Sequence, residues 1–298
     1  MTAHADSTER LAALRSMLAP CHLCPRTCGV DRPGGERGFC GAGACAVVAS
    51  AGPHFGEESC LVGRGGSGTI FLAGCNLGCA FCQNFDISSR VAGEEMDTAA
   101  LVRLMRGLEA RGCENINFVT PTHVTHAVAE AIVEAREAGL SIPIVWNSSG
   151  YESAEVLRLL DGLVEIYMPD FKFSRSESAQ RYCRAPDYPD CARAALAEMH
   201  RQVGDLVVED GVARRGLLVR HLVMPGGSDE SREILTFLAS LSPHTFVNVM
   251  GQYRPAGKVR GAAACGTFAA IARPPTPDEI LDARRCALTL GLRLDRRP

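Results

Sequence analysis

Short apolar runs alternate with segments of helical periodicity between residues 65 and 255, and this order restricts the fold more than any other feature. Apolar residues at i, i+3, i+4 and i+7 predict a helix after each of the first five runs. Strands that alternate with helices form parallel βαβ units. The pattern therefore predicts an α/β fold, either a doubly wound sheet or a barrel. The six expected strands are 69–73, 115–120, 142–147, 163–170, 217–224 and 246–250.

Polar residues follow each expected strand at its carboxyl end. In doubly wound sheets and in barrels alike, ligands bind at this end of the strands. The sequence therefore predicts a ligand site where the six ends meet. The polar segments are 74–76, 120–123, 147–149, 170–172, 225–226 and 252–254.

Composition excludes several classes of protein. Of the 298 residues, 46% are hydrophobic and 22% are charged, which is ordinary for a globular chain. The net charge of −3 predicts no general attraction to nucleic acid or to an acidic membrane. The longest uncharged run, 65–85, is rich in Gly and Cys, and the first ten residues are polar. We therefore expect no membrane span and a cytoplasmic location.

Cysteine is the unusual component, with fourteen residues. In a reducing compartment, clustered thiols more often bind metal or carry out redox chemistry than form disulfides. Seven cysteines are scattered, and we interpret them as small buried apolar residues. The other seven form two groups, Cys75, Cys79 and Cys82 in one and Cys21, Cys24, Cys28 and Cys40 in the other.

The three-cysteine group follows the first expected strand with the spacing C-x3-C-x2-C. Four thiolates would close a tetrahedral zinc site or saturate a four-iron cluster. Three thiolates leave one iron open to a small chelating molecule, which can then accept an electron. The spacing therefore indicates a cluster that binds a substrate directly.

This motif, with aromatic Phe81 before its last cysteine, resembles the signature of radical S-adenosylmethionine (SAM) enzymes. The resemblance implies a [4Fe-4S] cluster on Cys75, Cys79 and Cys82, with SAM chelating the fourth iron. It further implies one-electron cleavage of SAM to methionine and a 5′-deoxyadenosyl radical that abstracts hydrogen. The family fold is a partial (β/α)6 TIM-type barrel, which the six expected βα units match.

Within that family the chain looks similar to homologues of the pyruvate formate-lyase activating enzyme. The stretches that carry this likeness are GSGTIFLAGCNLGCAFCQN, VTPTH, NSSGY, PDFKF, APDYP, VRHLVMPG and QYRP. It implies a flavodoxin or ferredoxin as electron donor and a glycyl-radical enzyme as partner. Two alternatives remain open: radical modification of a small molecule, peptide or nucleotide, and a non-catalytic iron–sulfur or zinc protein. Nucleic-acid binding is disfavoured because Arg26, Arg32 and Arg37 form only a modest basic patch.

Family motifs also imply which residues contact SAM. Phe81 and Asn84 match residues beside the adenine, although Gln83 replaces a family His. The 147–149 segment matches a D-T-N motif along the methionine and ribose, and Asn147 lacks its negative charge, which argues against a tightly bound cation. The remaining SAM contacts that the motifs imply are Asn147, Ser148, Ser149, Asp170, Lys172 and Arg220.

One family motif is missing. A G-G-E stretch normally follows the second strand and holds the SAM amino group, but this chain has residues 120–123 there. Gly93–Glu95 resembles the motif in its letters but lies before the first helix, in the wrong place. The Thr120 carbonyl or the Thr122 hydroxyl could replace it, and His123 could reach the substrate. On strand alternation His221 points to the opposite face from Arg220, as a core or outer-layer histidine.

The four-cysteine group has the spacing C-x2-C-x3-C-x11-C. Four thiolates saturate a metal, so we expect a closed site, structural or electron-relaying, with zinc or a second [4Fe-4S] cluster. Residues 1–64 show no clear periodicity and are expected to be a Cys-rich extension held by this metal. The expected domains are 1–64, a barrel over 65–255, and a tail over 256–298 with a helix from about Asp278.

Overall fold

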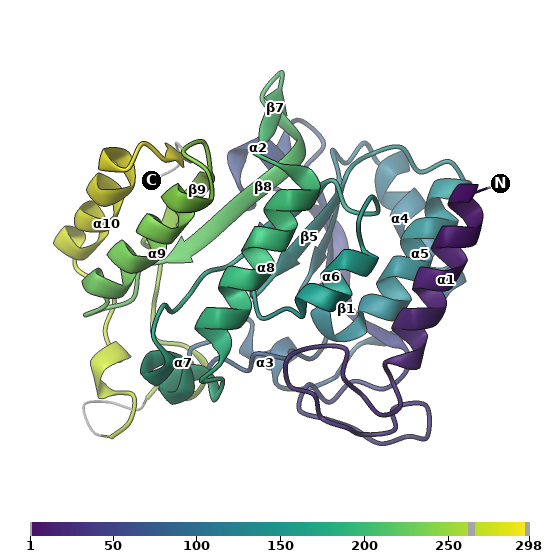
Figure 1. Ribbon diagram of the computed structural model, residues 1–298, viewed down its shortest axis with the longest axis horizontal. Coiled ribbons are helices and arrows are strands. Elements are labelled where there is room, and N and C mark those ends of the chain that lie inside the picture. Colours follow the sequence, from purple (N-terminus) through teal and green to yellow (C-terminus); the bar gives the residue numbers. More distant parts are fainter. Residues whose placement is uncertain (1, 262–265, 296–298) are drawn as a thin grey trace.

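The computed structural model describes residues 2–261 and 266–295, and a mostly parallel sheet runs through the molecule (Figure 1). Six adjacent strands of this sheet are parallel and correspond to the six predicted strands. They are β2 (Ser67–Leu72), β4 (Ile116–Val119), β5 (Ile144–Ser148), β6 (Ile166–Pro169), β8 (Val212–Leu222) and β9 (Phe246–Met250).

The parallel strands lie side by side in chain order, β2-β4-β5-β6-β8-β9. A doubly wound sheet reverses its strand order at a switch point, and this sheet does not. The α/β fold is therefore that of a partial barrel, as the family resemblance implies. Five helices connect the strands where periodicity predicted them: α4 (Thr98–Ala110), α5 (Thr125–Glu137), α6 (Ala154–Leu159), α8 (Tyr188–Val203) and α9 (Ser228–Leu241).

Four additional strands extend or border this sheet. The first, β1 (Ala46–His54), pairs antiparallel with β2 and carries β3 (Glu94–Met96) on its other side. At the opposite edge β10 (Arg293–Leu294) pairs with β9. A hairpin of β7 (Val207–Glu209) with β8 makes β8 begin at Val212, five residues before the predicted start. These strands are short or partly exposed, so they lack the continuous apolar runs that marked the central strands.

Residues 1–64, which show no clear periodicity, nevertheless contain regular structure that packs on the rest of the molecule. The segment contains α1 (Thr2–Ser16), which packs against α5 and α6, in addition to β1. Leu14, Met17 and Leu18 are buried in the main core. Helix α1 is rich in Ala and polar residues, and within residues 7–16 its one buried side chain is Leu14, which explains why its periodicity is weak. The segment is thus anchored by the core of the sheet.

Helix α2 (Ser59–Val62) closes the amino end of the inner face of the sheet. Leu61 packs there with Val145, Met168 and Leu218. The Asn115 amide donates a hydrogen bond of 2.7 Å to the Leu61 carbonyl and fixes the helix in place. Because this end is filled, the inner face is open only toward the carboxyl ends of the strands.

The remaining helices are α3 (Phe85–Ser88), α7 (Ser176–Cys183) and α10 (Pro277–Thr289), with 3₁₀ turns η1 (Thr122–Val124), η2 (Gly257–Val259) and η3 (Ala269–Ile271). Helix α10 begins one residue before the predicted position. Across residues 2–261 and 266–295, every helix is too short or too polar to cross a bilayer. Domain boundaries at 64 and 255 stay predictions, and residues 262–265 and 296–298 of the expected tail lie outside the described ranges.

Candidate functional site

A cavity of about 260 Å³ lies at the carboxyl ends of the parallel strands, slightly below the range of about 300–1,000 Å³ for small-ligand sites. The three-cysteine loop forms one wall and the strand ends form the other. Most of the side chains expected to hold SAM line this cavity. They are Phe81, Asn84, Thr120, Asn147, Ser148, Ser149, Asp170, Lys172 and Arg220, beside Cys75, Cys79 and Cys82.

The loop holds its thiols by local hydrogen bonds. The backbone N–H of Leu77 donates to Cys75 Sγ at 3.4 Å, and the Ser88 hydroxyl donates to Cys82 Sγ at 3.2 Å. Cys183 on α7 lies with its sulfur 3.5 Å from Cys79 Sγ, a neighbour that sequence spacing could not reveal. Burial raises the pKa of Cys75 to about 12. Without iron the thiol is protonated, whereas a bound metal holds a coordinating thiol as the thiolate.

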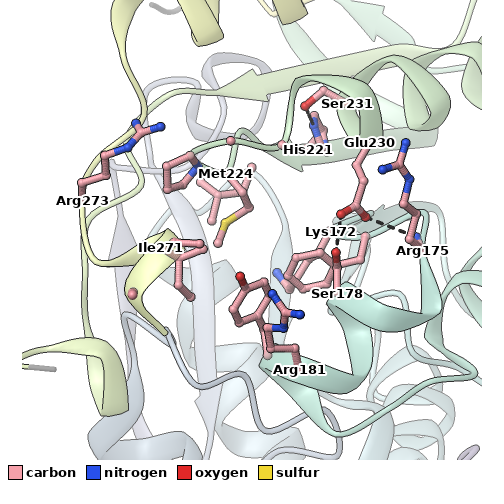
Figure 2. A pocket seen from close by; sticks show the side chains of 18 residues that line it. Lys172, Arg175, Ser178, Arg181, His221, Met224, Glu230, Ser231, Ile271 and Arg273 are labelled. Atoms are coloured by element: carbon pink, nitrogen blue, oxygen red, sulfur yellow. Dashed lines mark hydrogen bonds between the residues drawn. The ribbon is translucent and has the colours of Figure 1, made fainter. Parts of the chain in front are cut away.

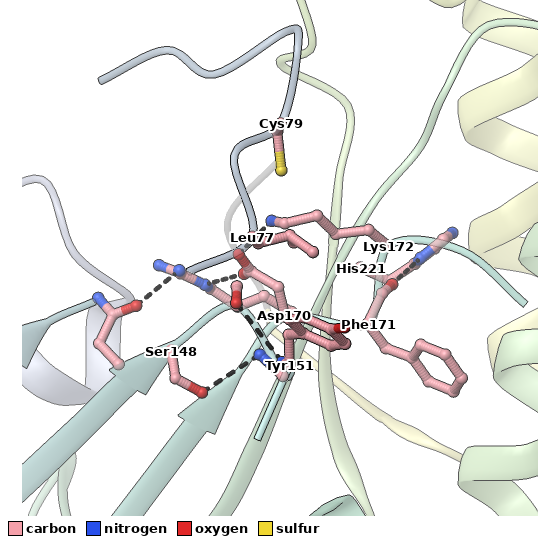
Figure 3. A network of polar contacts seen from close by, with 12 residues as sticks. Leu77, Cys79, Ser148, Tyr151, Asp170, Phe171, Lys172 and His221 are labelled. Atoms are coloured by element: carbon pink, nitrogen blue, oxygen red, sulfur yellow. Dashed lines mark hydrogen bonds and ion pairs between the residues drawn. The ribbon is translucent and has the colours of Figure 1, made fainter. Parts of the chain in front are cut away.

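Opposite the loop, Asp170 joins two cations in a buried network (Figure 3). Arg220 Nε donates to Asp170 Oδ1 at 2.8 Å, and Arg220 Nη2 donates to Asn147 Oδ1 at 2.7 Å. Lys172 Nζ pairs with Asp170 Oδ2. Burial by itself would raise the pKa of Asp170, but Arg220 and Lys172 outweigh it and lower that pKa. The carboxylate is therefore charged at neutral pH and fixes both cations.

The Lys172 ammonium extends toward the three-cysteine loop in Figure 3. Burial acts to lower the pKa of Lys172, yet the Asp170 carboxylate raises it above its ordinary value. The side chain thus stays cationic in a nearly dry site. It supplies a positive charge next to the thiols, where an anionic cluster or the carboxylate of a bound amino acid would gain from it.

Two acidic residues beneath this network, just before α2, were not identified from the sequence. Glu57 Oε2 lies 3.9 Å from Arg220 Nη1, and Asn248 donates to Glu58 Oε1 at 3.0 Å. Burial raises the pKa of Glu57 to about 7, although Arg220 opposes this rise. Both residues precede a four-residue helix in a segment without clear periodicity, so no sequence signal placed them inside the barrel.

Aromatic contacts fix Phe81 on the wall of the cavity. Its ring packs edge to face on Phe173 and Tyr253, with centroids 5.9 and 5.8 Å away. Asn84 lies at the start of α3, and the Ser148 hydroxyl accepts a hydrogen bond of 3.2 Å from Gly150 N–H. Phe173 and Tyr253 support the Phe81 ring without lining the cavity themselves.

Of the two residues proposed in place of the missing G-G-E motif, one lines the cavity in the structure and the other does not. Thr120 lines the cavity in a left-handed conformation (φ +61°), which is rare for a β-branched residue and common at binding sites. Thr122 is not part of the cavity wall, because its buried hydroxyl donates to Glu152 at 2.7 Å. Gly93–Glu95 lies at or beside the exposed edge strand β3.

The two histidines singled out from the sequence are both buried. His123 does not line the cavity at the strand ends, contrary to the expectation that it reaches the substrate, since its Nε2–H donates to the Ala73 carbonyl at 2.8 Å. His221 faces away from Arg220 as predicted: its Nδ1–H donates to the Phe171 carbonyl, and its Nε2 accepts from Ser231. Burial lowers the pKa of each histidine to about 4, so both are neutral near pH 7.

A second cavity of about 560 Å³ adjoins the first and shares Lys172 and Leu222 with it (Figure 2). The chain between β9 and α10 forms part of its wall at 269–273. Charged side chains in the wall are mainly basic, with Glu230 as the acidic member. This space connects the strand ends with the surface beside α7 and α9.

The four N-terminal cysteines also come together, around a small separate cavity that Asn76 and His123 border. Arg26 links this segment to the three-cysteine loop by donating to the carbonyls of Asn76 and Leu77, at 2.9 Å each. The two cysteine groups are therefore neighbours in space, although the expected strand 69–73 separates them in sequence.

The donor sets fit the two groups that the motif implies. Three convergent thiols suit a [4Fe-4S] cluster with one open iron. The facing wall offers amide, hydroxyl, carboxylate, ammonium and guanidinium groups beside an aromatic ring, which matches the mixed polarity of SAM. These residues would hold the two cofactors in adjoining positions.

Comparison with known proteins agrees with this assignment. Residues 69–238 match the family model described as the Radical SAM superfamily. The chain is 32% identical over 257 residues to the uncharacterized protein MJ0674 of Methanocaldococcus jannaschii, covering 83% of this chain and 69% of that protein. It is 26% identical to MJ0808 of the same organism, over 92% of this chain and 79% of that protein.

Among solved structures, QueE from Escherichia coli aligns with a TM-score of 0.43 and 12% identity, covering 86% of this chain and 95% of QueE. The match to the family model spans more than half of the chain and includes the three-cysteine loop, the Asp170 network and Arg220. The chain belongs to the radical SAM superfamily.

Proposed function

We propose that this protein is a radical SAM oxidoreductase that cleaves SAM reductively and abstracts a hydrogen atom from a bound substrate. The supporting observation is the cavity in which Cys75, Cys79 and Cys82 face the buried network of Asp170, Lys172 and Arg220. When bound, the cluster supplies one electron to the sulfonium of SAM and so generates a 5′-deoxyadenosyl radical. The protein's own contribution is to bind, orient and shield the reacting groups.

The charged network would orient the amino-acid end of SAM. Lys172 and Arg220 offer cationic donors to its carboxylate, and Asp170 fixes their positions from below. The left-handed backbone at Thr120 brings that residue to the cavity wall, where its carbonyl can accept from the SAM ammonium group. These contacts would hold the chelating end of SAM against the open iron.

The other end of SAM would lie on the remaining wall. Asn147 and Ser149 offer hydrogen-bonding groups to the ribose, while Phe81 and Asn84 flank the adenine. Phe81 is 4% exposed, so its ring excludes water from the reacting centre. Shielding matters because a primary carbon radical would be quenched by side reactions in an open site.

The second cavity would hold the substrate. It meets the first at Lys172 and Leu222, and it is lined by Arg175, Arg181 and Arg273. Arg175 and Arg273 pair with Glu233 and Glu279. Arg181 would therefore supply the positive charge that attracts an anionic group on the substrate, as in a small carboxylic or phosphorylated molecule or a peptide segment. A glycyl-radical enzyme as partner, and a flavodoxin or ferredoxin as donor, stay proposals that rest on the family resemblance.

Anaerobic turnover tests the proposed chemistry. The reconstituted protein is mixed with SAM and dithionite, and 5′-deoxyadenosine is quantified against a variant with Cys75, Cys79 and Cys82 all changed to Ala. We expect deoxyadenosine from the wild type alone. A fully iron-loaded wild type that forms no deoxyadenosine, and whose reduced cluster shows the same EPR signal with and without SAM, would overturn the proposal.

A further inference from the structure

The four N-terminal cysteines line one enclosed space, although they come from different turns of the segment. Cys21 and Cys24 are each 8% exposed. Gly38 lets the backbone approach Cys28, because a Cβ at this position would lie 2.8 Å from Cys28 Sγ. The next N–H, of Phe39, donates to that sulfur at 3.4 Å. Backbone donors directed at sulfur are typical of metal–thiolate sites.

A further group at this space indicates that it takes an anionic occupant. Arg32 borders the space, is 2% exposed and donates to the carbonyls of Gly43 and His123, rather than to any carboxylate in the described part of the chain. A buried guanidinium without a counter-charge is costly. A metal bound by four thiolates carries the negative charge that Arg32 lacks.

Four thiolates can hold a single zinc ion, with all four sulfurs about 2.3 Å from one atom, or a four-iron cluster, with one sulfur on each iron. Zinc does not change its oxidation state, so of these two occupants the cluster is the one that could exchange an electron with the three-cysteine group beside it.

The two cysteine groups share a wall. Cys40 lines a cavity of about 400 Å³ together with Cys75 and Cys79. The close approach of the segments is tight: a Cβ on Gly74 would lie 2.7 Å from the Cys40 carbonyl, and one on Gly78 would lie 2.9 Å from the Phe39 ring. Atoms in direct contact therefore connect one group to the other.

From these observations we propose that Cys21, Cys24, Cys28 and Cys40 bind a second [4Fe-4S] cluster that relays electrons to the cluster on Cys75, Cys79 and Cys82. The inference rests on the proposed function. One electron passes from a low-potential donor of the reduced flavodoxin or ferredoxin class to the second cluster, taking it from the 2+ to the 1+ state. The same electron then reduces the SAM-binding cluster from 2+ to 1+, and the second cluster returns to 2+. Neither step transfers a proton or forms or breaks a covalent bond.

Metal content tests the site itself. The wild type, purified and reconstituted without oxygen, should hold about eight irons per chain, about four for each cluster. A variant with Cys75, Cys79 and Cys82 changed to Ala should keep about four and should give an EPR signal on reduction that SAM does not alter. Cys113→Ala, which removes a buried thiol outside both groups, should match the wild type. If the variant with Cys75, Cys79 and Cys82 changed to Ala held zinc instead of iron, or held no metal, the proposal would be overturned.

Reduction kinetics test the relay. With Cys21, Cys24, Cys28 and Cys40 changed to Ser, dithionite should still reduce the remaining cluster, while reduced flavodoxin should do so at least tenfold more slowly than in the wild type. If flavodoxin reduced the remaining cluster equally fast in the Ser variant and in the wild type, the second cluster would have only a structural role, and the relay would be contradicted. The triple Ala variant provides an independent test, since flavodoxin should reduce its remaining cluster rapidly. Deoxyadenosine from the Ser variant with dithionite would uphold the proposed function even if the relay fails.

Discussion

The two cysteine groups occupy neighbouring positions but differ in what surrounds them. The loop of Cys75, Cys79 and Cys82 opens onto a cavity with charged and polar walls. The N-terminal group instead surrounds a small space of its own, and Cys40 alone among its four thiols also lines the cavity beside Cys75 and Cys79. The open group has three thiols and the enclosed group has four. An iron without a protein ligand can bind a substrate only where the fold also provides space and polar contacts for that substrate. An enclosed, saturated site suits electron transfer or structure instead.

The largest effect should come from removing the open group. Changing Cys75, Cys79 and Cys82 to Ala removes every expected ligand of the SAM-binding cluster, so deoxyadenosine formation should fall to the background level of dithionite and SAM alone. The measurement is chromatography of the anaerobic reaction. Deoxyadenosine formation above that background would show that another site cleaves SAM. The three-cysteine group would then not differ from the four-cysteine group in the way proposed.

Asp170→Asn tests the network that faces the open group. The change leaves Arg220 and Lys172 buried without their counter-charge, so the free energy of unfolding should fall by about 3–5 kcal/mol. Chemical denaturation followed by circular dichroism measures this loss. Asp190→Asn is the matched control, because the Asp190–Arg193 pair is exposed and should change stability by less than about 1 kcal/mol. Equal effects of the two changes would show that burial of the network is unimportant.

Glu57→Gln should alter how stability depends on pH. The folded-state pKa of about 7 lies above the ordinary value of 4.5, so wild-type stability should fall as pH rises between these two values. Gln does not titrate, and the variant should therefore gain about 1–3 kcal/mol relative to the wild type between pH 5 and pH 8. Denaturation at both pH values measures the gain. A difference that does not vary with pH would mean that Glu57 is ionised throughout.

The smallest effect is expected where the two groups are joined. Arg26→Lys keeps the charge but removes the guanidinium fork that donates to Asn76 and Leu77, which should cost about 1–2 kcal/mol. The three-cysteine cluster should also lose iron to a chelator faster than in the wild type, while Arg37→Lys, an exposed change, should not. If both variants release iron at the wild-type rate, Arg26 does not couple the two groups.

Sequence reasoning succeeded where one physical signal dominates. The central strands are buried on both faces, so their apolar runs identified all six, and strand alternation placed Arg220 and His221 on opposite faces. Motif spacing identified the cysteine loop. Helix α1 was missed because, within residues 7–16, its one buried side chain is Leu14.

Contacts between distant segments were beyond reach of the sequence. Cys183 lies beside Cys79 only because α7 packs over the loop, and Glu57 approaches Arg220 only because α2 closes the barrel. Thr122 and His123 were expected in the site since they follow a strand end. The chain turns there into η1, which directs Thr122 to Glu152 and His123 to Ala73.

The central claim is that SAM binds directly to the cluster of the open group. Pulsed EPR tests it on the reduced protein in which Cys21, Cys24, Cys28 and Cys40 are Ser, with SAM labelled with ¹⁵N in its amino group. We predict a shifted cluster signal and a resolved hyperfine coupling to ¹⁵N. A cluster whose signal is unchanged and shows no such coupling at saturating SAM would contradict the account.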